Sequence, residues 1–101
     1  MPAARPLVAT SVTYFSEGDE AAFFDWLDRI GCVGTVWGAG HDLFIPLARP
    51  SNLELRELLA LFHRYNVDMR QLARFANDRR KWFSDPIAYW RAAVFGSPPA
   101  S

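Results

Sequence analysis

The side chains best suited to catalysis are a cysteine, two histidines and an aspartate: Cys32, His41, Asp42 and His63. A thiol and an imidazole can form a nucleophile–base pair, and an imidazole beside a carboxylate can act as a general base. Only His41 and Asp42 are adjacent, in a glycine-rich turn where both residue types are common for turn geometry alone. We therefore predict that the protein is not an enzyme. A small-molecule enzyme is a third class, which requires that His41, Asp42 or His63 line a pocket.

Metal and phosphate sites are not indicated either. Structural zinc sites use cysteines and histidines paired a few residues apart, and this sequence has no such pair. GTVWGAG, residues 34–40, is rich in glycine, but a phosphate-binding loop needs a helix N-terminus directly after its glycines. The strand-like HDLFIPL follows instead. We predict neither a metal nor a cofactor.

Charge is balanced over the chain but uneven along it. Eleven basic residues match eleven acidic ones, so no global field draws the protein to nucleic acid or to a membrane. Residues 1–57 hold eight acids against four bases, and residues 58–101 hold three acids against seven bases. This division predicts one acidic surface and one basic surface.

The acidic residues concentrate in residues 16–28, where Phe24 lies away from the apolar stripe of the predicted helix. An acidic helix with an aromatic anchor suits a basic region of another protein. The candidate partner-binding residues are Glu17, Asp19, Glu20, Phe24, Asp25 and Asp28. The sequence thus favours a protein-binding domain, most concretely a small immunity-type or inhibitor protein that occludes a toxin or an enzyme; many adaptors fit as well.

Nucleic-acid binding is the alternative function. LFHRYNVDMRQLARFA, residues 61–76, resembles a helix-turn-helix DNA-binding unit, which keeps apolar residues where this chain has Leu61, Tyr65, Val67, Leu72 and Phe75. Phe62 stands where the motif has a small residue, and Asn66 where it usually has glycine. The resemblance implies a recognition helix over 69–80. The candidate nucleic-acid-binding residues are Arg70, Gln71, Arg74, Arg79, Arg80 and Lys81.

The elements that would position these residues begin with a strand over 8–15, rich in β-branched and aromatic residues. Ser16 then predicts the N-cap of a helix that extends to about Ile30 and ends at Gly31. Its inner stripe at helical spacing is Phe23, Trp26, Leu27 and Ile30.

A hairpin is predicted next, with strands over 32–37 and 43–48 around GAGHD. Pro46 cannot donate to a ladder, so the second strand is an edge strand, ends early or contains a bulge. Ser51 and Glu54 have capping-box spacing before a second helix. Its buried stripe is Leu55, Leu58, Leu59 and Phe62.

Two interpretations of residues 69–76 stay open. A strand would complete the β-α-β-β-α-β order of a ferredoxin-like sandwich, whereas strong helix formers and a capping-box spacing from Asp68 to Gln71 favour a helix. Asp85-Pro86 predicts the start of a last helix, with an inner stripe of Ile87, Trp90 and Val94 and a stop at Gly96.

The fold class that follows is α+β: a two-layer sandwich in which helices cover one face of an antiparallel sheet of three or four strands, with a C-terminal helix. We predict a single domain over 1–101, with 1–7 and 97–101 as loose tails. Residues 81–96 hold five of the fifteen aromatic residues, which predicts core packing with a homodimer contact as the alternative. A single cysteine and no apolar run of about 20 residues favour the cytoplasm over a membrane.

Overall fold

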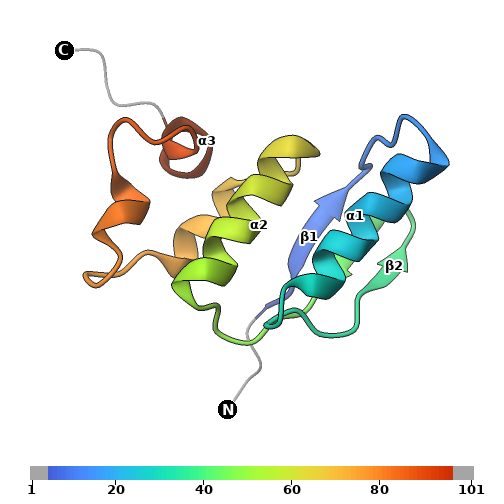
Figure 1. The fold of residues 1–101 in the computed structure, drawn as a ribbon, viewed down its shortest axis with the longest axis horizontal. Coiled ribbons are helices and arrows are strands. Elements are labelled where there is room, and N and C mark those ends of the chain that lie inside the picture. Colours follow the sequence, from blue (N-terminus) through green and yellow to red (C-terminus); the bar gives the residue numbers. More distant parts are fainter. Residues whose placement is uncertain (1–4, 97–101) are drawn as a thin grey trace.

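The computed structural model describes residues 5–96, and the protein is a small α+β domain with a three-stranded antiparallel sheet and several helices (Figure 1). Of the expected tails, residues 1–4 and 97–101 lie outside the described part, whereas Leu7 already belongs to the first strand. The elements in order are β1 (Leu7–Thr10), α1 (Glu17–Arg29), β2 (Trp37–Ala39), β3 (Asp42–Ile45), α2 (Asn52–Arg64), the 3-10 helices η1 (Arg70–Phe75) and η2 (Lys81–Ser84), and α3 (Arg91–Phe95).

The sheet has the order β1-β3-β2, so β3 is central. Leu7 pairs with Ile45 in the first ladder, and Trp37 pairs with Phe44 in the second. A hairpin forms as predicted, but its first strand is displaced along the chain: β2 spans Trp37–Ala39 instead of 32–37, and the turn is confined to Gly40 and His41. The second strand, β3, ends early, at Ile45, directly before Pro46. Beyond this residue the two arms stay paired, because the Gly34 N–H donates to the Pro46 carbonyl at 2.8 Å. The proline therefore ends the strand without opening the hairpin.

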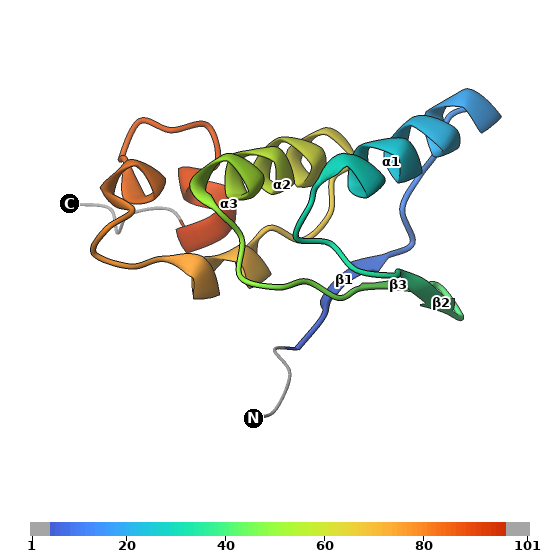
Figure 2. The ribbon, with the colours of Figure 1, turned by 60° about the horizontal axis from the view of Figure 1, so that its bottom comes forward.

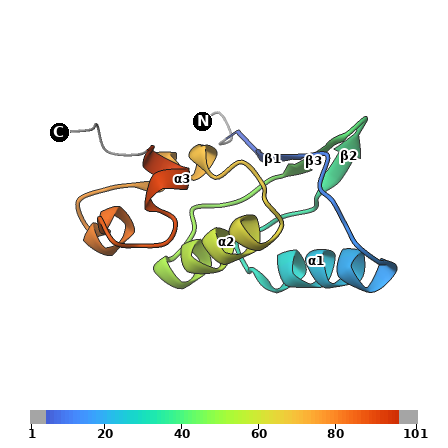
Figure 3. The same cartoon turned by 90° about the horizontal axis from the view of Figure 1, so that it is seen from above.

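The two faces of the sheet differ in what they contact. Side chains alternate along a strand, so Leu7, Ala9 and Ile45 share one face, and all three are buried. Figure 3 shows α1 and α2 on the same side of the sheet. The opposite face carries Val8, Phe44 and Trp37, which are aligned across the three strands by their register.

The first helix begins as the sequence predicts. The Ser16 hydroxyl accepts the Asp19 N–H at 3.1 Å, and the helix ends at Arg29 with Ile30 as its C-cap, one residue before the expected glycine. Phe23, Leu27 and Ile30 are buried. Trp26 is only half-buried, because its indole Nε1 reaches the edge of α2 and donates to Glu57 Oε1 at 3.0 Å.

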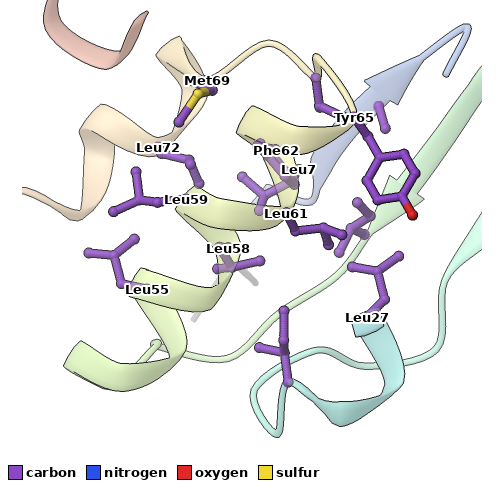
Figure 4. Close-up of a cluster of buried hydrophobic side chains, with 14 of the residues drawn as sticks. Leu7, Leu27, Leu55, Leu58, Leu59, Leu61, Phe62, Tyr65, Met69 and Leu72 are labelled. Atoms are coloured by element: carbon purple, nitrogen blue, oxygen red, sulfur yellow. The ribbon is translucent and has the colours of Figure 1, made fainter. Parts of the chain in front are cut away.

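The second helix provides the centre of the core. Its predicted capping box is confirmed: the Glu54 N–H donates to the Ser51 hydroxyl, and the Ser51 N–H donates to the Glu54 carboxylate. The buried residues of α2 are Leu55, Leu58, Leu59, Leu61 and Phe62. Figure 4 shows them between Leu7 of β1, Leu27 of α1 and Leu72 of η1. Burying each such side chain contributes about 1.5–3 kcal/mol relative to leaving it exposed.

The fourth strand of a ferredoxin-like arrangement is not formed. Residues 70–75 are a 3-10 helix, so the strand interpretation of 69–76 is wrong and the helix interpretation is right in kind but too long. The reason is a side chain: the Gln71 amide accepts the Val8 N–H and donates to the Val8 carbonyl, both at 2.8 Å. One glutamine thus occupies the hydrogen-bonding edge of β1 where a further strand would pair.

The last helix is shorter than predicted. It begins at Arg91 rather than at Pro86, because the Asp85 carboxylate accepts the Ile87 N–H at 3.0 Å and residues 85–90 form turns. Ile87 is 90% exposed, so its assignment to the core is wrong. Trp90 and Val94 are buried as expected, and Gly96 ends the helix with φ +84°.

The segment from η1 to α3 packs beside α2, on the side away from α1 (Figure 1 and Figure 2). Within residues 5–96, no helix is both long and apolar enough to cross a membrane.

Candidate functional site

The candidate catalytic residues do not come together. Cys32 is buried at the start of the hairpin, whereas His41 is exposed at its turn. His63 is exposed on α2, with its ring 4.9 Å from that of Tyr89. It borders a shallow hollow that neither His41 nor Asp42 reaches. Among the described residues, no group of three or more His, Cys, Asp or Glu side chains could hold a metal ion.

The Cys32 thiol and the Asp42 carboxylate both interact with neighbouring groups. Burial, together with the nearby Glu54 carboxylate, raises the pKa of the Cys32 thiol. The thiol therefore stays protonated near neutral pH, and a protonated thiol is a weak nucleophile. The Asp42 carboxylate accepts the Thr10 hydroxyl at 2.7 Å across β1 and β3. This contact gives Asp42 a structural partner other than the neighbouring His41.

The acidic candidates lie together on α1, and we call Glu17, Glu20, Phe24, Asp25 and Asp28 the acidic α1 surface. All five are exposed. Asp19 is different: it is half-buried, and its carboxylate accepts the Phe15 N–H at 3.0 Å. Asp19 therefore belongs to the N-terminal cap of α1 rather than to a free surface.

Phe24 is exposed, and its ring packs on a buried aromatic side chain. The residue is 37% exposed, and its ring centroid lies 5.4 Å from that of Phe23 in an edge-to-face arrangement. Phe24 also borders a hollow shared with Leu27, Val33 and Val36. Because its neighbours already fix the position of this ring, a partner can bind its apolar surface with little loss of side-chain entropy.

Phe15 is an exposed aromatic that the sequence analysis missed. It directly precedes the N-cap Ser16 and is 90% exposed. A hydrophobic residue at this position usually packs on the fourth residue of the helix. That residue here is Glu20, which offers no apolar partner. The sequence alone therefore indicates that the Phe15 ring lacks its usual apolar partner and is exposed.

The basic candidates near η1 are held by the protein itself. Arg70 makes a two-point contact with Asp68, with both N–O distances 3.0 Å, and these bonds lower the pKa of the Asp68 carboxyl. Arg74 donates to the Arg5 carbonyl at 2.7 Å. Gln71 is bound to Val8. The three side chains therefore lie along the edge of β1 and do not extend from a helix of recognition length.

The basic run 79–81 is divided. Arg79 and Lys81 are exposed, whereas Arg80 is 9% exposed and forms three hydrogen bonds. Its guanidinium donates to the Asn52 side-chain oxygen at 2.9 Å, to the Phe75 carbonyl at 2.8 Å and to the Pro50 carbonyl. Arg80 thus joins the end of η1 to the start of α2. The helix predicted over 69–80 is interrupted before this residue, because η1 ends at Phe75.

A further set of surface residues is visible only once the register is known. We call Val8, Phe44 and Trp37 the sheet-face row. Trp37 is 49% exposed and stacks on Phe44, with ring centroids 5.3 Å apart and an angle of 14° between the rings. The sequence places each residue on a strand, but it does not reveal which residues of different strands stand opposite one another.

The C-terminal aromatics mostly pack inside the molecule. Phe83 and Trp90 are buried, and the Trp90 indole N–H donates to the Phe83 carbonyl at 2.7 Å. Trp82 is half-buried under the Arg56 guanidinium, which lies 4.0 Å from its ring. Tyr89 and Ile87 remain exposed. Of the large hydrophobic side chains between residues 81 and 96, only these two are exposed.

Comparison of the chain with protein-family models, with curated proteins and with solved structures gave no match.

Proposed function

We propose that the protein is a non-catalytic protein-binding domain and that its partner contacts the acidic α1 surface. The carrying observation is the position of Phe24: an exposed, supported ring that follows Glu17 and Glu20 and precedes Asp25 and Asp28 on one helix. Within residues 5–96, the side chains of these four acids take part in no hydrogen bond or ion pair. A partner that supplies lysines or arginines around an apolar pocket would complement both features.

The charge pattern of α1 supports a basic partner. Glu17 and Glu20 stand three residues apart, as do Asp25 and Asp28, and like charges at this spacing repel each other. The helix dipole favours the first pair, which lies near the N-terminus, but disfavours Asp25 and Asp28 near the C-terminus, where Arg29 is the one basic residue of the last turn. Binding of a cationic surface would relieve this repulsion.

The most concrete form of the proposal is a small immunity-type or inhibitor protein that covers the active site of a toxin or enzyme in the cytoplasm. In this form Phe24 is the anchor, and the acids are the groups that speed the encounter. An adaptor with a basic partner uses the same surface without inhibiting anything. The two forms differ in whether the partner is an enzyme that loses activity on binding.

Cross-linking from Phe24 tests the surface. A photo-reactive amino acid at position 24, introduced into the full chain in its native cell, should capture a specific protein. The matched control places it at Leu53, which is exposed on α2. Capture from position 24 alone supports the proposal, whereas equal capture from both positions, or capture from position 53 alone, contradicts it.

Charge reversal then tests the mechanism with the captured partner. Asp28→Lys should slow association by about tenfold at low salt, because exposed charges mainly steer the encounter, and the effect should shrink at high salt. Asp78→Lys is the control: Asp78 is also exposed but lies in the C-terminal segment. Equal association rates for both variants would show that the acidic α1 surface is not part of the binding site. A partner enzyme that stays active in the complex would show that the protein is not its inhibitor.

A further inference from the structure

The outer face of the sheet has an aromatic pair with one open side. Val8, Phe44 and Trp37 lie opposite one another in register, on the face turned away from α1 and α2 (Figure 3). Trp37 packs one ring face on Phe44, and it is still 49% exposed. Its second ring face is therefore available to another flat group.

Arginines border the same face beyond β1. Val8 and Phe44 line one hollow together with Arg5, Arg70 and Arg74. These arginines are positioned by the fold, because Gln71 fixes η1 to both backbone groups of Val8. Arg74 is in turn bound to the Arg5 carbonyl, and Asp68 orients the Arg70 guanidinium. The stacking pair and the cations are thus parts of one continuous surface.

The charges on this border are only partly compensated. Within residues 5–96, Arg70 with Asp68 is the one ion pair, so Arg5 and Arg74 lie side by side without a carboxylate. Burial and, after it, the neighbouring Arg5 lower the pKa of Arg74, as expected for like charges placed close together. Asp42 is on the same face, but it lies at the hairpin end of β3 and accepts the Thr10 hydroxyl. The border opposite β2 therefore favours an anion.

We propose that this face binds single-stranded nucleic acid, with bases stacked on Trp37 and Phe44 and phosphates bound by Arg5, Arg70 and Arg74. Aromatic platforms beside cationic grooves bind single strands with little sequence preference, because every base has a π-face. Neighbouring strands are about 4.8 Å apart, so β2 and β1 are separated by about 10 Å. A flexible strand can place a base at one end and phosphates at the other. A duplex keeps its bases stacked on each other and offers this face only its phosphates.

This site is separate from the acidic α1 surface and does not depend on the proposed protein partner. It also differs from a helix-turn-helix interface. Gln71, a base-reading residue in that alternative, here has the structural task of holding η1 against β1. The bases would contact strands β2 and β3 instead of a recognition helix.

Fluorescence anisotropy with the full chain tests the proposal. The probes are fluorescein-labelled 12-nucleotide dT and rU strands and a 12-base-pair duplex, at low salt. We expect binding to the single strands that is at least tenfold tighter than to the duplex and that weakens as salt rises. Trp37 fluorescence should be quenched on binding, and a Trp37→Phe variant should lose most of this signal because Trp37 is exposed while Trp90 is buried.

Matched variants locate the site. Trp37→Ala should weaken single-strand binding by about tenfold, whereas Tyr89→Ala, which removes an exposed ring from the C-terminal segment, should not. Arg5→Ala and Arg70→Ala should each lower the salt dependence by about 0.7 in the logarithmic slope, whereas Arg79→Ala should leave it unchanged. Circular dichroism and thermal unfolding establish that each variant is folded.

Four results would overturn the proposal: no binding to either single strand at low salt, equal binding to the duplex, an unchanged affinity for folded Trp37→Ala, or an effect of Arg79→Ala as large as that of Arg70→Ala. The last result would assign the binding to the exposed run 79–81. A fifth result would also overturn it: a photo-reactive residue at position 37 that captures a protein but no nucleic acid in the cell would show that the sheet face is a protein interface.

Discussion

Between residues 7 and 64 the backbone forms the repeating hydrogen bonds of strands and long helices, whereas between residues 65 and 95 its backbone hydrogen bonds are those of turns and short helices. The first region contains the whole sheet and both thirteen-residue helices. The second contains two 3-10 helices and a five-residue helix. Side chains provide its hydrogen bonds to distant parts of the chain: Gln71, Arg74 and Arg80 each donate to a backbone carbonyl at least 30 residues away.

This difference between the two regions predicts how each responds to a single substitution. A helix or ladder loses a small part of its hydrogen bonds when one residue changes, because each backbone group has its own partner. A turn-rich segment that depends on one guanidinium loses several contacts at once. We therefore expect changes in the second region to loosen that segment, and changes in the core of the first region to lower the stability of the whole domain.

The largest expected effect is that of Phe62→Ala. Phe62 is fully buried on α2 between the two regions, and truncation leaves a cavity, so the free energy of unfolding should fall by about 3–5 kcal/mol. Chemical denaturation measures this, with Leu53→Ala, an exposed position on the same helix, as the control. A loss below about 1 kcal/mol would show that the buried face of α2 is assigned wrongly.

Arg80→Met should come next. The substitution keeps the aliphatic stem but leaves the Pro50 and Phe75 carbonyls without their donor. We expect a loss of about 2–3 kcal/mol, since hydrogen bonds from charged groups contribute more than neutral ones. Amide hydrogen exchange should accelerate over residues 77–95 far more than in α1. Uniform acceleration over the chain would mean that the two regions unfold as one unit.

Gln71→Leu should cost less, about 1–2 kcal/mol, because the two Val8 groups that lose a partner are only part-buried and water can reach them. Chemical denaturation measures the loss for Gln71→Leu. A free energy of unfolding equal to that of the original chain would contradict the Gln71–Val8 pairing.

Ser51→Ala should give the smallest change, about 1 kcal/mol, because it removes the hydroxyl that accepts the Glu54 N–H in the capping box. Thermal unfolding detects a loss of this size, and Ser84→Ala, at an exposed serine of the second region, is the control. A change as large as that of Arg80→Met would mean that single side chains are no less important in the first region than in the second.

The candidate sites were predictable to different degrees. The acidic residues of α1 and the exposure of Phe24 follow from helical periodicity, because the same stripe that buries Phe23 and Leu27 turns the others outward. The sheet-face row was not predictable, since the pairing of Trp37 with Phe44 and of Phe44 with Val8 depends on a register that no local pattern contains.

The sequence by itself determined the parts whose causes are local. Ser16 and Ser51 start the two long helices by binding backbone groups three residues away, Pro46 ends β3 because it has no N–H to donate, and Gly96 ends α3 because glycine adopts positive φ at no steric cost. These interactions are complete within a few residues, so their patterns can be recognised in one dimension.

Tertiary structure decided the rest, because the determining partners are distant in sequence. Whether residues 69–76 form a strand or a helix depends on Gln71, whose partner Val8 is 63 residues away. Whether Arg80 faces water like its neighbours Arg79 and Lys81 depends on an acceptor at Pro50, which is 30 residues away. Locally, Gln71 could be a helix former and Arg80 a surface charge. Each takes its actual role only when the folded chain brings an unpaired backbone carbonyl close to its side chain.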